Sequence, residues 1–319
     1  MTSLTSARTR RRTLVTVVLA PIACGLLVAG TLAAAWVAIG SPTPASGAVW
    51  FQVSKLAGAQ YTGAPDQPFF ALVIGTGARS DDPNEAHDDP GLADAIHVIG
   101  INPSLGSATI LDIPRDTEGP TGAKLNSYIV GSDKNFGLRA EADAVSAVTG
   151  LPISYVIRAN FPNFVQMVDE IGGIDVEIPY DMADENSGAF FTAGPNHLTG
   201  DQALALSRNR YTLPRGDLDR TVNQGLVLLS ALKTLQAKQP GAGDTIRLVA
   251  TAGRHVKLDG LGVRDLLALG QLALSVDANN VKNVLLPVAN SGNGSNLAKT
   301  ADAESLLADM ADDGVLQSH

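Results

Sequence analysis

The chain has 319 residues, of which 45% are hydrophobic and 17% are charged, so it is long enough to bury a substantial core. All 32 acidic residues and 18 of the 23 basic residues lie after Pro65, which gives that part a formal charge of −14. An acidic body of this kind excludes nucleic acid as the partner, because phosphate backbones are bound by basic faces. Cys24 is the only cysteine, so the sequence contains no disulfide framework and no thiolate metal site.

The N-terminal segment has the pattern of a membrane anchor. Arg8 and Arg10–Arg12 precede a charge-free run of 26 residues, Leu14–Ile39, which is long enough to cross a bilayer. The basic cluster predicts that the N-terminus stays in the cytoplasm and that the body lies outside. A cleaved signal peptide, with a cleavage region at 45–48, is the alternative. Cys24 fits a lipoprotein site poorly, because the apolar run continues well beyond it.

The sequence therefore predicts a cytoplasmic tail over 1–13, a transmembrane helix over 14–39, a linker rich in Pro, Gly and Ala over 40–65, and an extracytoplasmic domain over 66–319. Such a domain has no supply of ATP. Any group transfer there must use an activated substrate that is delivered across the membrane.

Strands and helices are predicted in alternation along the body. Short apolar runs bounded by turn residues predict strands at 69–74, 95–101, 108–113, 153–157, 174–178 and 284–287. Apolar residues at helical spacing predict helices over 138–148, 161–171, 199–206, 218–235 and 263–274. Thr199 and Gln202 have the spacing of a capping box. This mixture indicates an α/β fold in one domain.

One stretch of the acidic body gathers positive charge. Four arginines fall within 13 positions, at Arg208, Arg210, Arg215 and Arg220. They surround the predicted start of a helix, whose N–H groups and dipole favour an anion, and guanidinium groups match phosphate oxygens in bidentate fashion. The alternative is a surface network of salt bridges with Asp217 and Asp219.

A second cluster follows the predicted strand that ends at Ile113. Pro114 ends the strand, and Arg115 and Asp116 follow it at a strand end, where α/β folds bind ligands. Asp94 precedes another strand, and a carboxylate in this position suits Mg²⁺ but is also typical of a turn. Lys124 and Asn126 add a cation and an amide.

These motifs, in this order, resemble the LytR–CpsA–Psr family of wall glycopolymer ligases. The resemblance rests on an ordered set of motifs: Pro-Arg-Asp-Thr at 114–117, Lys-Leu-Asn at 124–126, Val-Asp-Glu-Ile-Gly-Gly-Ile-Asp-Val at 168–176, Leu-Thr-Gly-Asp-Gln-Ala-Leu at 198–204, Arg-x-Arg at 208–210 and Asp-x-x-Arg-x-x-x-Gln at 217–224. It extends from about Phe69 to at least Leu235, and the single N-terminal span matches as well.

The resemblance implies a three-layer α/β/α domain with a mixed sheet and a hydrophobic tunnel for a polyprenyl chain. It implies a phosphotransferase of the cell membrane that moves a glycopolymer from a polyprenyl-pyrophosphate donor to a peptidoglycan hydroxyl and releases polyprenyl phosphate. The residues matched to the phosphate clamp are Arg115, Arg208, Arg210 and Arg220, with Gln224, Lys124 and Asn126 in support. Asp94 and Asp116 match ligands of Mg²⁺ or another divalent cation, and Asp217 would position Arg220 or assist proton removal.

The chain departs from the family pattern at two places. Many members carry an aspartate where this chain has Gly77, and many have Arg-Ser-Asp-Thr where this chain has Leu-Ala-Asp-Ala at 92–95. Metal binding by two acids is therefore less secure than the arginine clamp. Arg79, two residues after Gly77, would add a charge for substrate binding.

The sequence offers three alternatives to transfer. A scaffold or regulator that binds polyprenyl lipid or wall glycan without catalysis would need fewer of these charged residues. Gly-Thr-Gly at 75–77 is a weak dinucleotide pattern, since Ser80 stands where a third glycine belongs. A serine hydrolase is disfavoured because no nucleophile elbow is present and the histidines are scattered; His87 and His97 are expected to be a loop and a strand residue.

Overall fold

The computed structural model describes residues 51–57, 67–77, 91–130, 137–237, 256–262, 265, 269, 272–273 and 276–317. The tail and the membrane span predicted over 1–13 and 14–39 lie outside these residues, as do Arg79 and His87. Within the described parts of the chain, no helix combines the length and the apolar character that crossing a bilayer requires.

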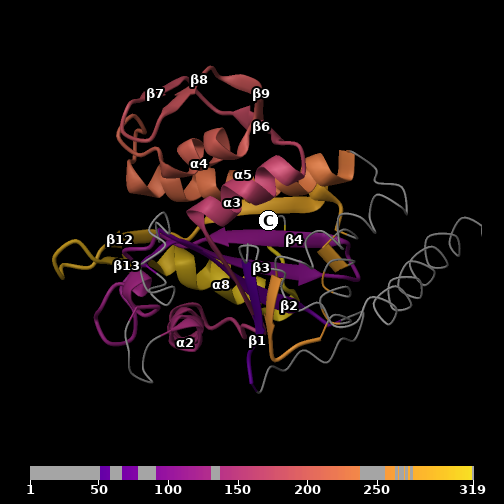
Figure 1. Ribbon diagram of the computed structural model, residues 1–319. Coiled ribbons are helices and arrows are strands. Elements are labelled where there is room, and N and C mark those ends of the chain that lie inside the picture. Colours follow the sequence, from indigo (N-terminus) through magenta and orange to yellow (C-terminus); the bar gives the residue numbers. More distant parts are fainter. Residues whose placement is uncertain are drawn as a thin grey trace, which may run out of the picture.

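A mixed sheet of seven strands forms the centre of the described domain, in the order β10-β1-β5-β2-β3-β4-β11 (Figure 1). The strands are β1 Phe51–Lys55, β2 Phe69–Thr76, β3 Ala93–Asn102, β4 Ser107–Asp112, β5 Tyr155–Asn160, β10 Val256–Asp259 and β11 Val281–Leu285. The pairs β1–β10, β2–β5 and β4–β11 are parallel, and the other three are antiparallel.

The predicted strands are confirmed, with small changes at their ends. The last one begins earlier than predicted, at Val281, and stops before Pro287, which lacks the N–H that pairing needs. β1 lies within the segment 40–65 that was predicted to be a linker, and this prediction is wrong for Phe51–Lys55. This segment pairs with β5 and β10, which are distant in sequence.

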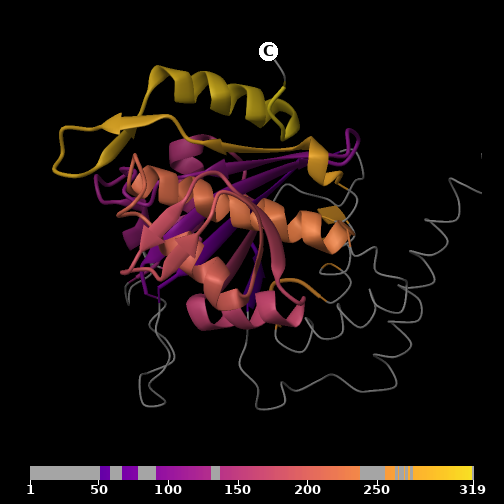
Figure 2. The same ribbon diagram turned by 90° about the horizontal axis from the view of Figure 1, so that it is seen from above.

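Helices cover both faces of the sheet (Figures 1 and 2). α2 (Leu138–Thr149) and α8 (Ala301–Asp313) lie on one face, and α5 (Asp217–Ala237) lies on the other. Successive residues of β2 point to opposite faces: Phe70 packs in the cluster of α2 and α8, and Phe69 packs in the cluster of Leu229 on α5. Apolar residues on both faces make the sheet a buried layer.

A third apolar cluster lies above α5 and carries the upper part of the site. It joins α3 (Phe161–Glu170), α4 (Gly200–Arg208) and two small antiparallel sheets, β6 (Ile174–Ile178) with β9 (Gly194–Leu198) and β7 (Met182–Asp184) with β8 (Ala189–Phe191). The capping box at the start of α4 is confirmed: the side chain of Thr199 accepts from the Gln202 N–H, and that of Gln202 accepts from the Thr199 N–H.

The remaining elements are short. They are the 3-10 helices η1 (Leu125–Ser127) and η2 (Ala278–Asn280) and the hairpin of β12 (Val288–Asn290) and β13 (Leu297–Lys299). Most of the helix predicted over 263–274 falls outside the described residues. Gly75 and Thr76 belong to β2, so they do not form the phosphate-binding turn of a dinucleotide fold.

Candidate active site

A cavity of about 350 Å³ opens at one edge of the sheet and is called the arginine cavity here. It lies where β2, β4 and β5 reach their carboxyl ends and where β3 begins, the edge at which α/β sheets bind ligands. Its lining comes from these strand ends, from the β7–β8 loop and from the region between α4 and α5: Gly77, Asp94, Arg115, Phe161, Asp184, Asn186, Ser187, Ser207, Arg208, Arg210, Tyr211, Arg220 and Gln224.

Four arginines face this cavity although they come from two distant parts of the chain. Arg115 follows β4, and Arg208, Arg210 and Arg220 surround the α4–α5 connection. Asp94 and Asp184 are the acidic lining residues, so the lining has a formal charge of +2 in an otherwise acidic body. An electrostatic surface of this kind favours an anion.

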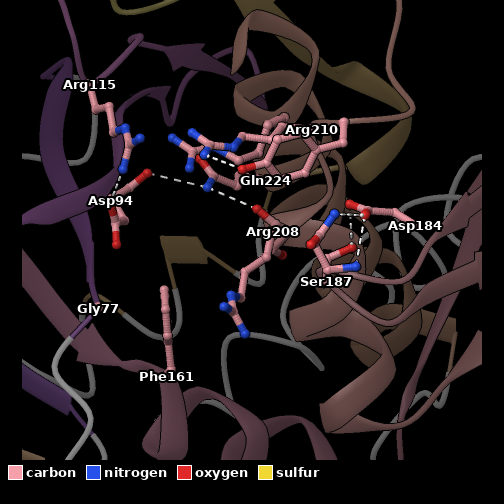
Figure 3. Close-up of a pocket in the computed structure, with 13 residues that line it drawn as sticks. Gly77, Asp94, Arg115, Phe161, Asp184, Ser187, Arg208, Arg210 and Gln224 are labelled. Atoms are coloured by element: carbon pink, nitrogen blue, oxygen red, sulfur yellow. Dashed lines mark hydrogen bonds and ion pairs between the residues drawn. The ribbon is translucent and has the colours of Figure 1, made fainter. Parts of the chain in front are cut away.

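Two carboxylates hold two of the arginines in a connected network. Arg115 forms an ion pair with Asp94 (Figure 3), and its Nε lies 3.7 Å from Oδ2 of Asp217. Asp217 also binds Arg220, with 3.0 Å between its Oδ1 and Nη2 of the guanidinium. Burial lowers the pKa of Arg220 and the charge of Asp217 raises it, but an arginine stays protonated in either case.

Among the described residues, the network leaves one N–H donor of Arg115 and one of Arg220 without a hydrogen bond. The Nε atoms of Arg115 and Arg220 are buried and have no hydrogen-bond partner within the described part of the chain. Leaving a buried donor unpaired costs about 1–3 kcal/mol, and more for a charged group. Both residues also line the arginine cavity, where their positive charge attracts an anionic ligand.

Aromatic rings support the other two guanidinium groups. Arg208 lies 5.6 Å from the ring centroid of Phe161. Arg210 lies 4.7 Å from the ring centroid of Tyr211 and donates to the Tyr211 hydroxyl at 2.7 Å. The hydrogen bond to Tyr211 is the main cause that raises the pKa of Arg210, and the charges of Asp217 and Asp116 act in the same direction.

Gln224 joins three parts of the site. It lies one helical turn after Arg220 on α5, and its Nε2 donates to the backbone oxygen atoms of Asp94 at 3.3 Å and Ser207 at 3.1 Å. It therefore fixes the start of α5 against β3 and the end of α4 (Figure 3).

The β7–β8 loop forms the opposite wall, and the sequence did not indicate its role. Asp184 and Ser187 lie across the cavity from Asp94 and Arg115 (Figure 3). The Asp184 carboxylate accepts from the Asn186 N–H at 3.0 Å and from the Ser187 hydroxyl at 2.9 Å. Residues 184–188 have the composition of a turn, but nothing local shows which site a turn will cover.

Three predicted residues lie beside the cavity rather than in its lining. Asp116 and Lys124 form an ion pair with 3.0 Å between Oδ1 and Nζ. Asn126 is buried, and its backbone N–H donates to the backbone oxygen of Arg115 at 3.1 Å, which fixes the segment that carries this arginine. The structure thus brings Asp94, Arg115, Arg208, Arg210, Arg220 and Gln224 to one cavity, with Asp217 in contact with two of its arginines.

The salt-bridge alternative holds for Arg215. This side chain is 56% exposed and binds Asp219, with 2.6 Å between Nη2 and Oδ1. It does not line the arginine cavity. The four arginines of the 208–220 stretch therefore divide into three that face the cavity and one surface pair.

The donor set for a divalent cation contains one accessible carboxylate. Asp94 Oδ1 binds Arg115, whereas Oδ2 faces Gly77, where an added Cβ would lie 2.5 Å away. Gly77 thus leaves room beside Oδ2. No group of three or more His, Cys, Asp or Glu side chains that could hold a metal occurs among the described residues. One carboxylate fits Mg²⁺ if substrate phosphates and water complete its shell, which is its usual binding mode.

The chain is similar in sequence to proteins that are named as teichoic acid transferases. It is 34% identical over 168 residues to the polyisoprenyl-teichoic acid–peptidoglycan teichoic acid transferase TagU of Bacillus cereus (strain AH820), which covers 52% of each chain. Identity to TagV of Bacillus subtilis (strain 168), which bears the same transferase name, is 28% over 192 residues, 57% of this chain and 48% of TagV. The chain spans about half the length of the curated relatives it matches.

Solved structures support the same fold. The crystal structure of B. subtilis TagV superposes with a TM-score of 0.61 at 21% identity, over 79% of this chain and 99% of TagV. The LytR-Csp2A-Psr enzyme from Actinomyces oris gives a TM-score of 0.61 at 23% identity, over 78% and 91%. The structure described as TagT bound to LIIa-WTA superposes with a TM-score of 0.59 at 19% identity, over 80% of this chain and 94% of that chain. A model of the LytR_cpsA_psr family matches residues 48–311, and the chain belongs to this family.

Proposed function

We propose that this chain is a phosphotransferase that moves a glycopolymer from a polyprenyl-pyrophosphate carrier onto a peptidoglycan hydroxyl. The observation that carries the proposal is the cavity lined by four arginines, whose lining has a formal charge of +2 in an otherwise acidic body. The names of TagU and TagV and the ligand named for TagT support the same substrate class.

The reaction requires little covalent chemistry from the protein. The acceptor hydroxyl oxygen attacks the phosphorus that carries the glycan, and a new P–O bond forms. The bond from this phosphorus to the bridging oxygen breaks, polyprenyl phosphate leaves with the electron pair, and the hydroxyl proton passes to a carboxylate or to water. Positioning and neutralisation of charge supply most of the catalysis in phosphoryl transfer.

The arginines have separable roles in this proposal. Arg115 and Arg220 line the cavity and would bind the phosphate oxygens through the guanidinium groups that border it. Arg208 and Arg210 close the cavity from the α4 side. Asp217 orients Arg115 and Arg220, because it lies between them, and Gln224 fixes the start of α5. Asp116 and Lys124 add charge beside the cavity, and Arg79 remains a predicted substrate ligand.

Asp94 is proposed to hold Mg²⁺, or another divalent cation, together with the donor phosphates. The cation would neutralise phosphate charge when bound. Asp94 has a second task that is independent of the cation, because its other oxygen orients Arg115. Asp116 is the weaker candidate ligand, since its carboxylate is paired with Lys124.

The carrier lipid needs an apolar surface that leads away from the arginine cavity. The cluster between the sheet and α5 offers one toward the opposite ends of β2 and β4, and Leu228, Leu232 and Leu261 pack against it while remaining partly exposed. We propose that the polyprenyl chain lies along this cluster and that residues 14–39 anchor the chain with its body outside the cytoplasm. A C-terminal reporter that is active only outside the cytoplasm tests the orientation; an inactive fusion would contradict it.

Two measurements on the purified full chain test the function. Native mass spectrometry should detect a co-purified polyprenyl phosphate or pyrophosphate, and the chain should transfer glycan from a short-chain polyprenyl-pyrophosphate donor to peptidoglycan. A bound carrier without transfer would favour the scaffold, and the absence of both would remove the proposal.

A further inference from the structure

A second cavity, of about 330 Å³, lies between α4 and the β7–β8 loop. One face of α4 lines it with Asp201, Leu204, Ala205 and Arg208, which follow the spacing of a single helix face. Ser187 and Gly188 line it from the loop. We call it the α4 cavity.

The α4 cavity and the arginine cavity share a wall. Arg208 and Ser187 line both of them. The wall is well supported, because Ser187 donates to the carboxylate of Asp184, which is 2% exposed, and the Arg208 guanidinium lies over the ring of Phe161. The two cavities are therefore neighbours, with Arg208 and Ser187 between them.

The two cavities differ in charge. The arginine cavity carries four arginines against two aspartates, whereas the α4 cavity balances Asp201 against the shared Arg208. Asp201 would repel a phosphate. A carboxylate and the nearby Gln202 side chain can bind hydroxyl groups, and Leu204 and Ala205 offer an apolar surface. An uncharged sugar ring has both features, with hydroxyls at its edge and C–H groups on its faces.

We propose that the α4 cavity is a carbohydrate subsite that binds a sugar ring of one reacting glycan, next to the phosphates in the arginine cavity. The inference rests on the proposed function and adds the ligand class of a neighbouring site. The sugar belongs either to the donor polymer or to the peptidoglycan acceptor, which present the same hydroxyl chemistry.

Direct binding of phosphate-free glycans tests the subsite without relying on transfer. The probes are a peptidoglycan disaccharide and the oligosaccharide released from the donor without its phosphates, titrated calorimetrically into the full chain. Asp201→Asn removes the carboxylate charge, and Leu204→Trp fills the cavity. Glu185→Gln is the matched control, because Glu185 is exposed on the neighbouring loop and lines neither cavity.

One of the two probes should bind to the wild-type chain and to Glu185→Gln equally, and about tenfold more weakly to Asp201→Asn and Leu204→Trp, since a charged hydrogen bond is lost or the space is filled. The probe that responds identifies the source of the sugar. Melting curves verify folding, and Asp201→Asn decides alone if Leu204→Trp unfolds. Binding of neither probe, or equal binding to all four proteins, would overturn the subsite. Transfer by the wild-type chain is measured separately, so a failure of the proposed function is distinguishable.

Discussion

The arginine cavity and the core beneath α2 both bury polar groups, but the groups differ in kind. The cavity buries the Nε–H donors of Arg115 and Arg220, whose charge is permanent. The core on the other side of the sheet buries Glu141 of α2, whose carboxyl has no side-chain hydrogen-bond partner among the described residues. Arg115 and Arg220 border an open cavity, whereas Glu141 is fully buried.

The two regions differ in how the free-energy cost of burying these polar groups is reduced. An arginine cannot discharge, so its positive charge is balanced by the carboxylates beside it or by an anion that enters the cavity. A carboxyl can take up a proton, and burial raises the pKa of Glu141 to about 8. The cavity therefore attracts an anionic ligand, whereas the buried carboxyl of the core takes up a proton.

The largest expected effect is on the stability of the fold between pH 4.5 and 8, where Glu141 titrates. Because burial raises the pKa of Glu141 from its ordinary value of 4.5 to about 8, the neutral carboxyl stabilises the fold fully below pH 4.5, and this contribution is lost as the pH rises towards 8. Glu141→Gln removes this dependence. As the pH rises from 4.5 to 8, the free energy of unfolding of Glu141→Gln should therefore increase relative to that of the wild type, by on the order of 4 kcal/mol.

Chemical denaturation at several pH values measures this gain. Asp143→Asn is the control, because Asp143 lies on the same helix but is exposed and paired with Arg139. A constant difference between Glu141→Gln and the wild type across the pH range would contradict the assignment.

A smaller effect is expected when the shape of a buried cation changes. Arg220→Lys keeps the positive charge but loses the fork that reaches both Asp217 and a phosphate. The rate of transfer should fall by about 100-fold, similar to the loss of one donor that stabilises a transition state. Transfer kinetics with a melting curve for each protein provide the measurement. Wild-type kcat in Arg220→Lys would mean that charge alone suffices.

Removing the carboxylate beside Gly77 should have a more modest effect. Asp94→Asn keeps a side chain of nearly the same shape, but it weakens the ion pair with Arg115 and removes the proposed cation ligand. We expect transfer to fall by about tenfold, since one charge-assisted interaction is lost. The response to added Mg²⁺ should also become shallower. If the Mg²⁺ titration is unchanged while kcat falls, Asp94 acts only by orienting Arg115 and does not bind the cation.

The local pattern of the sequence was sufficient to predict most strands and helices. The runs that became β2, β3 and β4 are strongly apolar, and the capping box of α4 depends on residues three apart. β1 was missed because Phe51–Lys55 is short, lies next to residues typical of a linker, and forms a strand only through pairing with β5 and β10.

The site was predicted in its residue types but not in its boundaries. Arg210 and Arg215 are similar in sequence context, yet the first lines the cavity and the second pairs with Asp219 at the surface. The contributions of Asp184, Ser187 and Phe161 depend on how the β7–β8 loop and α3 pack over the sheet edge. Such long-range placement leaves no signal within a short window of sequence.

The activity of an arginine double variant tests whether the arginine cavity binds the phosphates of the donor. Arg208→Ala/Arg210→Ala removes two cations that line the cavity, and Arg215→Ala removes one that forms a surface pair, which typically contributes about 0–1 kcal/mol. All three proteins are assayed for glycan transfer from a short-chain polyprenyl-pyrophosphate donor to peptidoglycan, with melting curves in parallel. We expect no detectable transfer by the double variant, transfer by Arg215→Ala within about twofold of wild type, and closely similar melting temperatures. Full transfer by Arg208→Ala/Arg210→Ala would contradict the phosphate clamp and leave a non-catalytic binding protein as the better description.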